Sequence, residues 1–371
     1  MTVILFLIVL VALIVVHEFG HLVAAKLCKM RVDEFGIGYP PKALTFYRSG
    51  GTDYTLNWLP FGGFVKIYGE DGDEKDTSDS GRHTGVSFTK RPKWQQALVL
   101  LAGIFMNLVF AWVLISIAVS LGVPRALSSE EIPTAKEVSL LVSRVVEGSP
   151  AERAGLMVGD TIVNVGDSVR SFEEQDAEAF TDFISNTHAG DTLSLTIERE
   201  GDIQTLTAVP QAGVVPTDTE RVALGVGVAS VGVVQVPWWQ APLEGARITV
   251  SATGQIAMGL VQFFKGLFTF SADLSDVSGP VGIVGAVGDA SAHGLSALLM
   301  LTAVISINLA LINVLPVPAL DGGRLLFVVI EAITRKPIPH TVAGSVNALG
   351  FALLILLMLV VTAHDVLKLF S

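Results

Sequence analysis

Four long apolar runs divide the chain, and each is long enough to cross a bilayer. A membrane-spanning helix needs about 20 mostly apolar residues. The runs that meet this length are residues 3–27, 97–121, 295–315 and 342–363. The first has no basic residue before Lys26, so it lacks the basic start of a cleavable signal peptide. The pattern predicts four retained transmembrane helices.

A fifth apolar segment, residues 243–270, is interrupted by polar side chains. These are Arg247, Gln255, Gln262 and Lys265. A helix with one apolar and one polar face commonly lies in the membrane interface. We interpret the segment as such an amphipathic helix, and a fifth span is the alternative.

The segment that follows the first apolar run has the composition of β-strands. Residues 35–68 are rich in aromatic and β-branched side chains, with Gly pairs at 50–51 and 62–63. Strand-like runs separated by Gly-containing turns predict short hairpins. Because these apolar hairpins follow a membrane helix directly, we expect them to associate with the membrane interface.

The long region after the second run alternates between strands and short helices. The stretch "SRVVEGSPAERAGLMVGDTIVNVGD" (143–167) has a short helix between two apolar strands. Its SPAxxAGLxxGDxI pattern resembles the PDZ domains of bacterial proteases, and the resemblance extends over residues 138–212. A PDZ fold offers a sheet edge to which an extended peptide can add as a strand. The β-rich run 221–237 has no second such pattern, and we interpret it as linker.

The composition agrees with an integral membrane protein. Of the 371 residues 51% are hydrophobic and only 16% are charged, whereas soluble domains have about 25% charged residues. The net charge of −11 argues against nucleic acid as a partner, because no basic surface would neutralise phosphates. A single cysteine, Cys28, excludes an internal disulfide. The predicted fold class is a polytopic α-helical membrane protein of about four transmembrane helices, with a membrane-associated β-hairpin region and an inserted extracytoplasmic α+β PDZ domain.

The distribution of Lys and Arg predicts the orientation of these helices. Basic residues gather in 28–93 and 322–341, whereas 125–294 is acidic. Short basic loops stay in the cytoplasm, so both termini and the long middle region are expected outside. Only an even number of spans separates the two basic loops correctly, which favours the interfacial interpretation of 243–270.

Ionisable side chains interrupt the first apolar run at "HEFGH". His17 and His21 are four residues apart, so both imidazoles project from one helix face and can share a metal ion. The H-E-x-x-H pattern is that of zinc metalloproteases, in which Glu18 would be the base. An ionisable group at the centre of a membrane helix costs about 2.5–3.5 kcal/mol on insertion scales. Three such groups in five residues therefore predict a metal site.

A catalytic zinc ion takes three protein ligands and leaves one position open. Asp321 is the candidate for the third, because Pro316 and Pro318 interrupt the helix before it and free the backbone to turn inward. The alternative is that Asp321 only caps a helix. The sequence predicts one zinc ion (Zn²⁺) per chain, held by His17, His21 and Asp321.

Two motifs together resemble the site-2 protease family of intramembrane zinc metalloproteases. They are HEFGH and N-x-x-P-x-P-x-L-D-G, which here extends from Asn313 to Gly322. Shorter matches are AGIFMN (102–107), PFGGFVKIYGE (60–70), which resembles the membrane hairpin of the family, and SGPVGI (278–283). The resemblance covers most of the chain. Enterobacterial relatives carry two PDZ domains, whereas only one is evident here.

The resemblance implies roles for the remaining polar residues. Glu18 would activate the water and later give its proton to the leaving amine. Asn313 and Asn107 would contact the substrate backbone, and the alternative for each is a bridge between helices. A transmembrane substrate must unwind to expose its carbonyls, and the hairpin at Gly62, Gly63 and Phe64 would offer it an edge strand.

The predicted segments are 1–27 (first span with HExxH), 28–93 (cytoplasmic hairpin loop), 94–121 (second span), 138–212 (PDZ domain), 213–294 (extracytoplasmic linker and amphipathic helix), 295–321 (third span with LDG) and 342–365 (fourth span).

The activity implied is proteolysis within the bacterial inner membrane, near its cytoplasmic side. The implied substrates are single-span membrane proteins, such as anti-sigma factor-like proteins already trimmed by a site-1 protease, and remnant signal peptides. One rival is an inactive PDZ scaffold, against which the intact Glu18 argues. Another is a metal transporter, which would need a path of polar residues across the bilayer. No such path continues outward from His17 through "MTVILFLIVLVALIVV", which argues against it.

Overall fold

The computed structural model describes residues 1–70, 85–167, 170–188, 190–199, 201–214, 221–269 and 279–368. Parts of the predicted segments 28–93, 138–212 and 213–294, including Ser278 of SGPVGI, lie outside the described residues. The chain divides into two compact units. The helical unit comprises residues 1–118 and 238–371, and the sheet unit comprises residues 119–237.

Long helices make up most of the helical unit. They are α1 (Thr2–Leu27), α2 (Lys93–Leu121), α5 (Ala241–Phe268), α6 (Pro280–Ala292), α7 (Leu295–Val314), α8 (Asp321–Thr334) and α9 (His340–Lys368), and a short 3-10 helix, η1 (Phe88–Lys90), precedes α2. Within the described ranges, four helices are long and apolar enough to cross a membrane, namely α1, α2, α7 and α9. The predicted number of spans is confirmed, and the protein is a multi-pass membrane protein.

The third membrane helix is shorter than the predicted span 295–321. α7 stops at Val314, because Leu315 precedes a proline and is extended (φ −61°, ψ 140°). Asp321 is then the first residue of the separate helix α8. Residues 295–321 are therefore one membrane helix and a connecting turn, and the turn brings the start of α8 back toward the end of α7.

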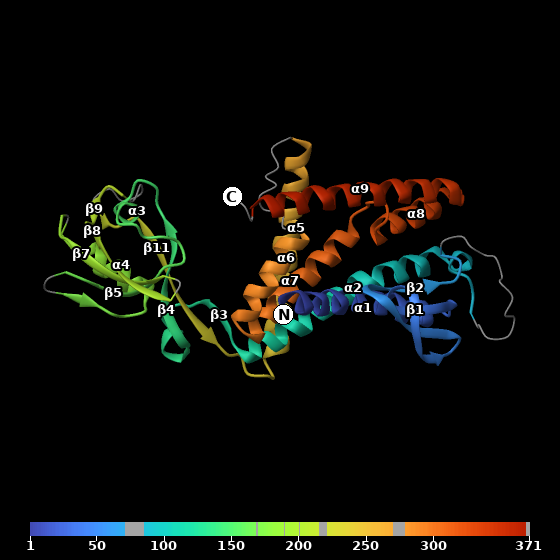
Figure 1. Cartoon of the computed structure of the whole chain (residues 1–371), viewed down its shortest axis with the longest axis horizontal. Coiled ribbons are helices and arrows are strands. Elements are labelled where there is room, and N and C mark those ends of the chain that lie inside the picture. Colours follow the sequence, from blue (N-terminus) through green and yellow to red (C-terminus); the bar gives the residue numbers. More distant parts are fainter. Residues whose placement is uncertain are drawn as a thin grey trace. The chain divides into compact units, whose positions relative to one another are not determined.

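The fifth apolar segment forms the 28-residue helix α5, which is not among the four candidate spans. In Figure 1, α5 is drawn at a steep angle to the directions of α1 and α9. α5 packs against α7, and its position in the membrane interface stays a prediction. α6 packs against α1, α7 and α9.

The strands β1 (Val32–Ser49) and β2 (Thr52–Ile67) form one bent two-stranded sheet rather than several short hairpins. The turn at Gly50–Gly51 is as predicted, but the second Gly pair lies inside β2. The bends let residues 34–37 pair with both 63–66 and 53–56, while 44–49 pair with 52–56. Residues 63–66 therefore form an outer segment of this sheet.

The sheet unit contains the region predicted as a PDZ domain. Its elements are β3 (Val123–Ala126), η2 (Ile132–Thr134), β4 (Lys136–Val145), α3 (Pro150–Arg153), β5 (Thr161–Gly166), β6 (Ser171–Phe172), α4 (Ala177–Ser185), β7 (Leu193–Arg199), β8 (Asp202–Ala208), β9 (Gln211–Ala212), β10 (Val222–Ala223) and β11 (Val226–Val234). The main sheet has the order β3-β11-β4-β5-β7-β8. Its core includes Leu140, Ile162 and Leu195, which are fully buried or nearly so.

Local capping explains the short helices of this unit. Ser149 caps α3 by accepting the N–H of Glu152, with Pro150 in the first turn. Asp160, in the GD pair of the motif, accepts two hydrogen bonds from Arg199 (2.7 and 2.8 Å). These bonds hold the pKa of the Asp160 carboxyl below its usual range.

The run 221–237 is not a linker. β11 pairs with β4 on one side and with β3 on the other, so the sheet unit begins and ends beyond residues 138–212. Leu224 is almost completely buried in the same core. The interpretation as linker is wrong because the small apolar residues of this run fit between two strands, although they show little apolar–polar alternation.

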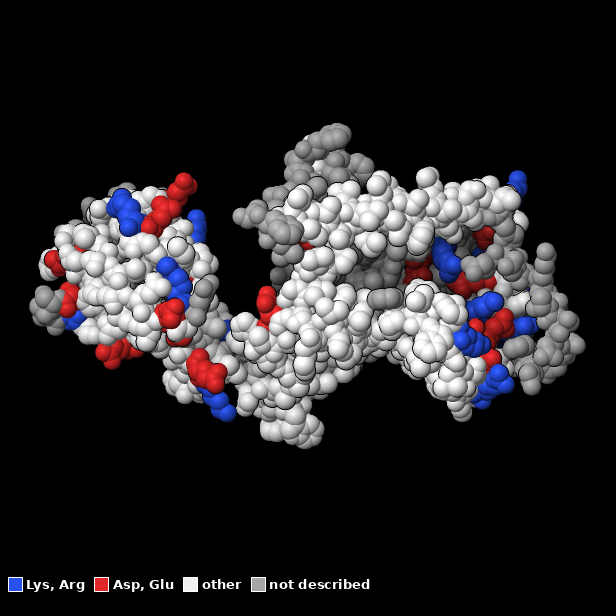
Figure 2. All heavy atoms as spheres, viewed as in Figure 1, with Lys and Arg blue, Asp and Glu red and all other residues white. Residues whose placement is uncertain are grey.

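Charged side chains are unevenly distributed over the helical unit. Figure 2 shows them gathered around the β1–β2 end and almost absent from the middle of the unit. Ion pairs at that end join Arg31 to Asp33 and Lys93 to Glu331. The uncharged middle matches the apolar interior of a bilayer.

Candidate metal centre

α1 places two imidazoles side by side. His17 and His21 are one helical turn apart, and both are buried. Their ring centroids are 4.7 Å apart in an edge-to-face arrangement, and the Nε2 atoms are separated by 3.1 Å. The pair therefore presents two nitrogen ligands at one point on the face of α1.

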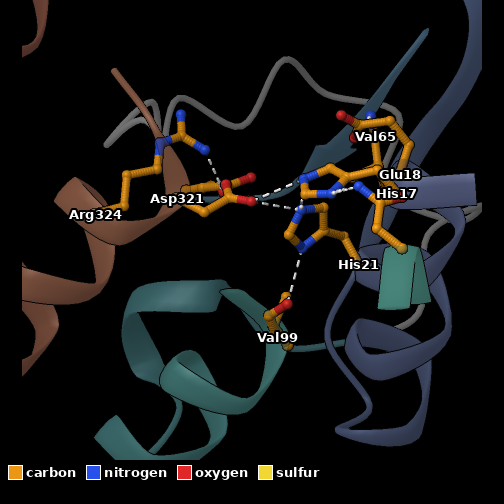
Figure 3. A network of polar contacts seen from close by, with 9 residues as sticks. His17, Glu18, His21, Val65, Val99, Asp321 and Arg324 are labelled. Atoms are coloured by element: carbon orange, nitrogen blue, oxygen red, sulfur yellow. Dashed lines mark hydrogen bonds and ion pairs between the residues drawn. The ribbon is translucent and has the colours of Figure 1, made fainter. Parts of the chain in front are cut away.

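The third ligand arrives from α8, 300 residues later in the chain. Oδ2 of Asp321 lies 2.8 Å from Nε2 of His17 and 3.1 Å from Nε2 of His21 (Figure 3). In the part of the chain that the structure describes, these three residues are the group whose ligand atoms could share one metal ion. The sequence-predicted ligand set is thus assembled by the fold.

The separations between the ligand atoms fit a tetrahedral zinc ion. Bonds of about 2.0–2.1 Å imply ligand atoms about 3.3 Å apart, close to the 2.8–3.1 Å found here. Nδ1 of His21 lies 2.8 Å from the carbonyl oxygen of Val99, which fixes Nε2 as the free nitrogen. Two imidazoles and one carboxylate leave a fourth position for water or substrate.

Close backbone approach lets α2 pack against the imidazoles. A Cβ added at Gly103 would lie 2.7 Å from Cε1 of His21 and 2.9 Å from Cε1 of His17. A Cβ at Gly20 would lie 2.8 Å from the carbonyl carbon of Ala102. Glycine at both positions therefore brings α1 and α2 together at the metal centre.

We expect Gly103→Ala to weaken zinc binding by about 10–100-fold, the usual effect of disturbing the groups that support metal ligands. The added methyl group must displace one or both imidazoles, although alanine stabilises a helix relative to glycine. The zinc content of the purified protein after dialysis against a chelator measures this. Gly285→Ala is the matched control, because a Cβ at this helical glycine meets open space. Parent-like zinc retention by Gly103→Ala would contradict the packing argument.

Glu18 lies where the outer segment of the hairpin sheet meets α1. The backbone N–H of Val65 donates a 3.0 Å hydrogen bond to Oε2 of Glu18 (Figure 3). A Cβ at Gly63 would be 3.9 Å from Cγ of Glu18. The candidate base and the candidate edge strand are therefore in direct contact.

The other hairpin residues support this segment. Gly62 has a φ of +90°, which favours glycine, and a Cβ added there would lie 3.2 Å from Cδ1 of Ile14 in α1. Phe64 stacks on Tyr39, with ring centroids 6.3 Å apart. The segment 62–64 is thus held close to the helix that carries the HExxH motif.

The two asparagines occupy different surroundings. Asn313 is buried in the last turn of α7, and its contact with substrate stays a prediction. The sequence predicts a substrate contact for Asn107 also, but its side chain is fully buried and its amide nitrogen lies 3.2 Å from Nδ1 of His17. A substrate has no access to Asn107 in this conformation.

The sequence did not predict two residues that contact the site residues, namely Val65 and Val99. Both act through backbone atoms, the N–H of Val65 and the carbonyl of Val99. Backbone groups are common to all residue types, so no residue-type signal could have identified them.

Comparisons with known proteins place this chain beside zinc metalloproteases. The profile of peptidase family M50 matches residues 5–357. A protein of Clostridium perfringens named as a candidate zinc metalloprotease is 36% identical over 358 residues, covering 96% of this chain and 95% of its own length. Zinc metalloprotease RasP of Oceanobacillus iheyensis is 30% identical over 446 aligned positions, covering 100% of this chain and 99% of its own. A solved PDZ domain from Listeria monocytogenes is 20% identical and covers 24% of this chain and 85% of its own, with a TM-score of 0.20.

Proposed function

The chain belongs to peptidase family M50 and is a zinc metalloprotease of that family, and on this premise we propose that it hydrolyses peptide bonds within the transmembrane segments of single-span membrane proteins. One observation carries the proposal: the HExxH histidines lie on α1, a helix apolar enough to span a membrane, and meet Asp321 within the unit that holds the four candidate spans. Zinc held there would supply a Lewis acid that polarises the scissile carbonyl and the attacking water.

Glu18 is the general base in this proposal. Its carboxylate is next in sequence to His17, and the N–H of Val65 fixes one of its oxygens. The other oxygen can accept the proton of the attacking water and pass it to the leaving amine. The hydrogen bond from Val65 orients the base without using its whole acceptor capacity.

The hairpin segment 63–66 supplies the binding edge. A membrane helix pairs its own backbone groups, so its carbonyls are shielded until it unwinds. An unwound stretch in the bilayer needs new backbone partners, and an outer strand beside the base offers them by strand addition. The pairing of 63–66 with 34–37 on one side leaves the other side toward α1 and Glu18.

Helix-breaking residues in a substrate span are therefore expected to speed cleavage. Proline costs about 3 kcal/mol and glycine about 1 kcal/mol within a helix. If unwinding limits the rate, one proline near the cleavage point raises it by up to about 100-fold and one glycine by about 5-fold. The test compares tagged substrates whose spans are Ala/Leu-only or carry one such substitution, with the purified protease in detergent.

The control substrate carries the same proline at the outer end of its span, away from the cleavage point. It is expected to be cleaved at nearly the rate of the Ala/Leu-only substrate. Equal rates for all four substrates would remove unwinding from the mechanism.

We also propose the orientation implied by the charge pattern and the partners implied by the family resemblance. The basic residues of 28–93 and 322–341 support a cytoplasmic position for the β1–β2 sheet and the metal centre, with the sheet unit outside the bacterial inner membrane. By that resemblance, the substrates would be anti-sigma factor-like proteins trimmed by an upstream site-1 protease, and remnant signal peptides. The PDZ-like sheet unit would exclude bulky outer domains or recognise newly made ends.

A further inference from the structure

Asn107 is a fully buried polar side chain that the proposed chemistry does not use. Its Nδ2 atom lies 3.2 Å from Nδ1 of His17, within hydrogen-bond distance. Its Oδ1 atom is buried and has no hydrogen-bond partner among the residues that the structure describes. A buried amide with one unused oxygen beside a metal ligand requires an explanation.

The orientation of His17 determines whether Nδ1, the ring nitrogen directed away from the metal centre, carries a hydrogen. Nε2 of His17 faces Asp321 and His21, so Nε2 is the atom directed to the metal. A neutral imidazole that binds through Nε2 carries its hydrogen on Nδ1 and can only donate there. A donor that faces the NH₂ group of Asn107 has no acceptor.

Exchanging the oxygen and nitrogen of the amide gives the Nδ1–H of His17 an acceptor and moves the NH₂ group to the position of the unpartnered atom. The two orientations of an asparagine amide have the same shape and are assigned from their hydrogen bonds. We propose that Asn107 is a positioning residue, in which Oδ1 accepts the Nδ1–H of His17 and so holds Nε2 toward the metal.

His21 shows the same arrangement with a different acceptor. Its Nδ1 lies 2.8 Å from the carbonyl oxygen of Val99. Val99 and Asn107 are eight residues apart on α2 with Gly103 midway, so all three lie along one face of that helix. One stripe of α2 therefore provides an acceptor for each histidine and space for the rings between them.

The backbone of Asn107 is also fixed. The hydroxyl of Ser306 on α7 donates a 2.8 Å hydrogen bond to its carbonyl oxygen, and both residues are fully buried. α7 thus holds this point of α2, which keeps the Asn107 amide in register with His17. Substituting a hydrogen-bond partner of a metal-bound histidine typically weakens metal affinity by about 10–100-fold.

The test is zinc affinity of the full-length protein in detergent, measured by competition with a chromophoric chelator. Asn107→Leu removes the acceptor at similar volume and is expected to weaken zinc binding by about 10–100-fold. Asn107→Asp and Asn107→Gln keep an acceptor oxygen, and at least one is expected to stay within about 3-fold of the parent. Asn308→Leu is the matched control, because among the described residues that amide donates to the carbonyl of Val304 in its own helix and not to a metal ligand.

Two results would overturn the proposal. Parent-like affinity in Asn107→Leu would show that His17 needs no acceptor there. Equal weakening in the Leu, Asp and Gln variants would show that the residue only fills space. Because zinc affinity is read without any substrate, these outcomes are independent of whether the protease cuts within membranes.

Discussion

Glu18→Gln is expected to give a folded, zinc-loaded protein that cleaves its substrate at least about 10²–10⁴-fold more slowly, the range contributed by a general base. Glutamine has nearly the same shape, and its amide oxygen can still accept the N–H of Val65. It cannot take a proton from water at neutral pH. The rate is measured on a tagged single-span substrate in detergent, with zinc content determined on the same sample.

His17→Ala separates the loss of the base from the loss of the metal. That variant removes a ligand, so it should lose both zinc and activity, whereas Glu18→Gln should lose activity alone. Cleavage by Glu18→Gln at a rate near that of the parent would show that another group accepts the proton. It would also remove the main argument against a scaffold role for the chain.

The metal ligands were predictable from sequence because helical spacing marks the two histidines and helix-breaking prolines mark Asp321. The i, i+4 spacing places His17 and His21 on one face of any helix. The prolines before Asp321 allow α7 to stop at Val314, after which the chain turns back. The apolar surroundings made the polar residues conspicuous. Local patterns were therefore sufficient to identify a divided site.

The supporting groups were not predictable, because an apolar helix does not reveal which face it buries. α2 is apolar on nearly every side, and its sequence alone does not show that Val99, Gly103 and Asn107 form the face against the imidazoles. The resemblance singled out AGIFMN (102–107), which contains Gly103 and Asn107, but not their contacts. Only the packing of α1 on α2 reveals that Asn107 lies against His17.

The β regions show a different limit of sequence reasoning. Glycine pairs mark tight turns and also places where backbones approach closely. The pair at 50–51 is a turn, but at 62–63 the chain continues as a strand beside Ile14 and Glu18. Residues 63–66 form a strand because they pair with the distant residues 34–37. β11 likewise forms a strand because it pairs with the distant strands β3 and β4.

Asp321→Asn is expected to lose zinc more completely than any change in a supporting group. The anionic carboxylate is a strong ligand and offsets part of the charge of Zn²⁺ in an apolar environment, whereas a neutral amide oxygen is a poor zinc ligand. The affinity should therefore fall by more than the roughly 10–100-fold associated with outer partners. Metal analysis of the purified protein after dialysis measures the zinc per chain, and proteolysis should fall with it.

This variant also decides between a ligand and a helix cap. Asp321 is the first residue of α8, where Leu320 holds the cap position, and its carboxylate turns to the two histidines. Loss of a negative charge from the first turn of a helix costs only about 0.3–1 kcal/mol, so α8 should persist in Asp321→Asn while zinc is lost. Asp289→Asn, an exposed substitution on α6, should retain zinc. Full zinc occupancy in Asp321→Asn would restore the capping interpretation, because then only His17 and His21 would be needed to hold the metal.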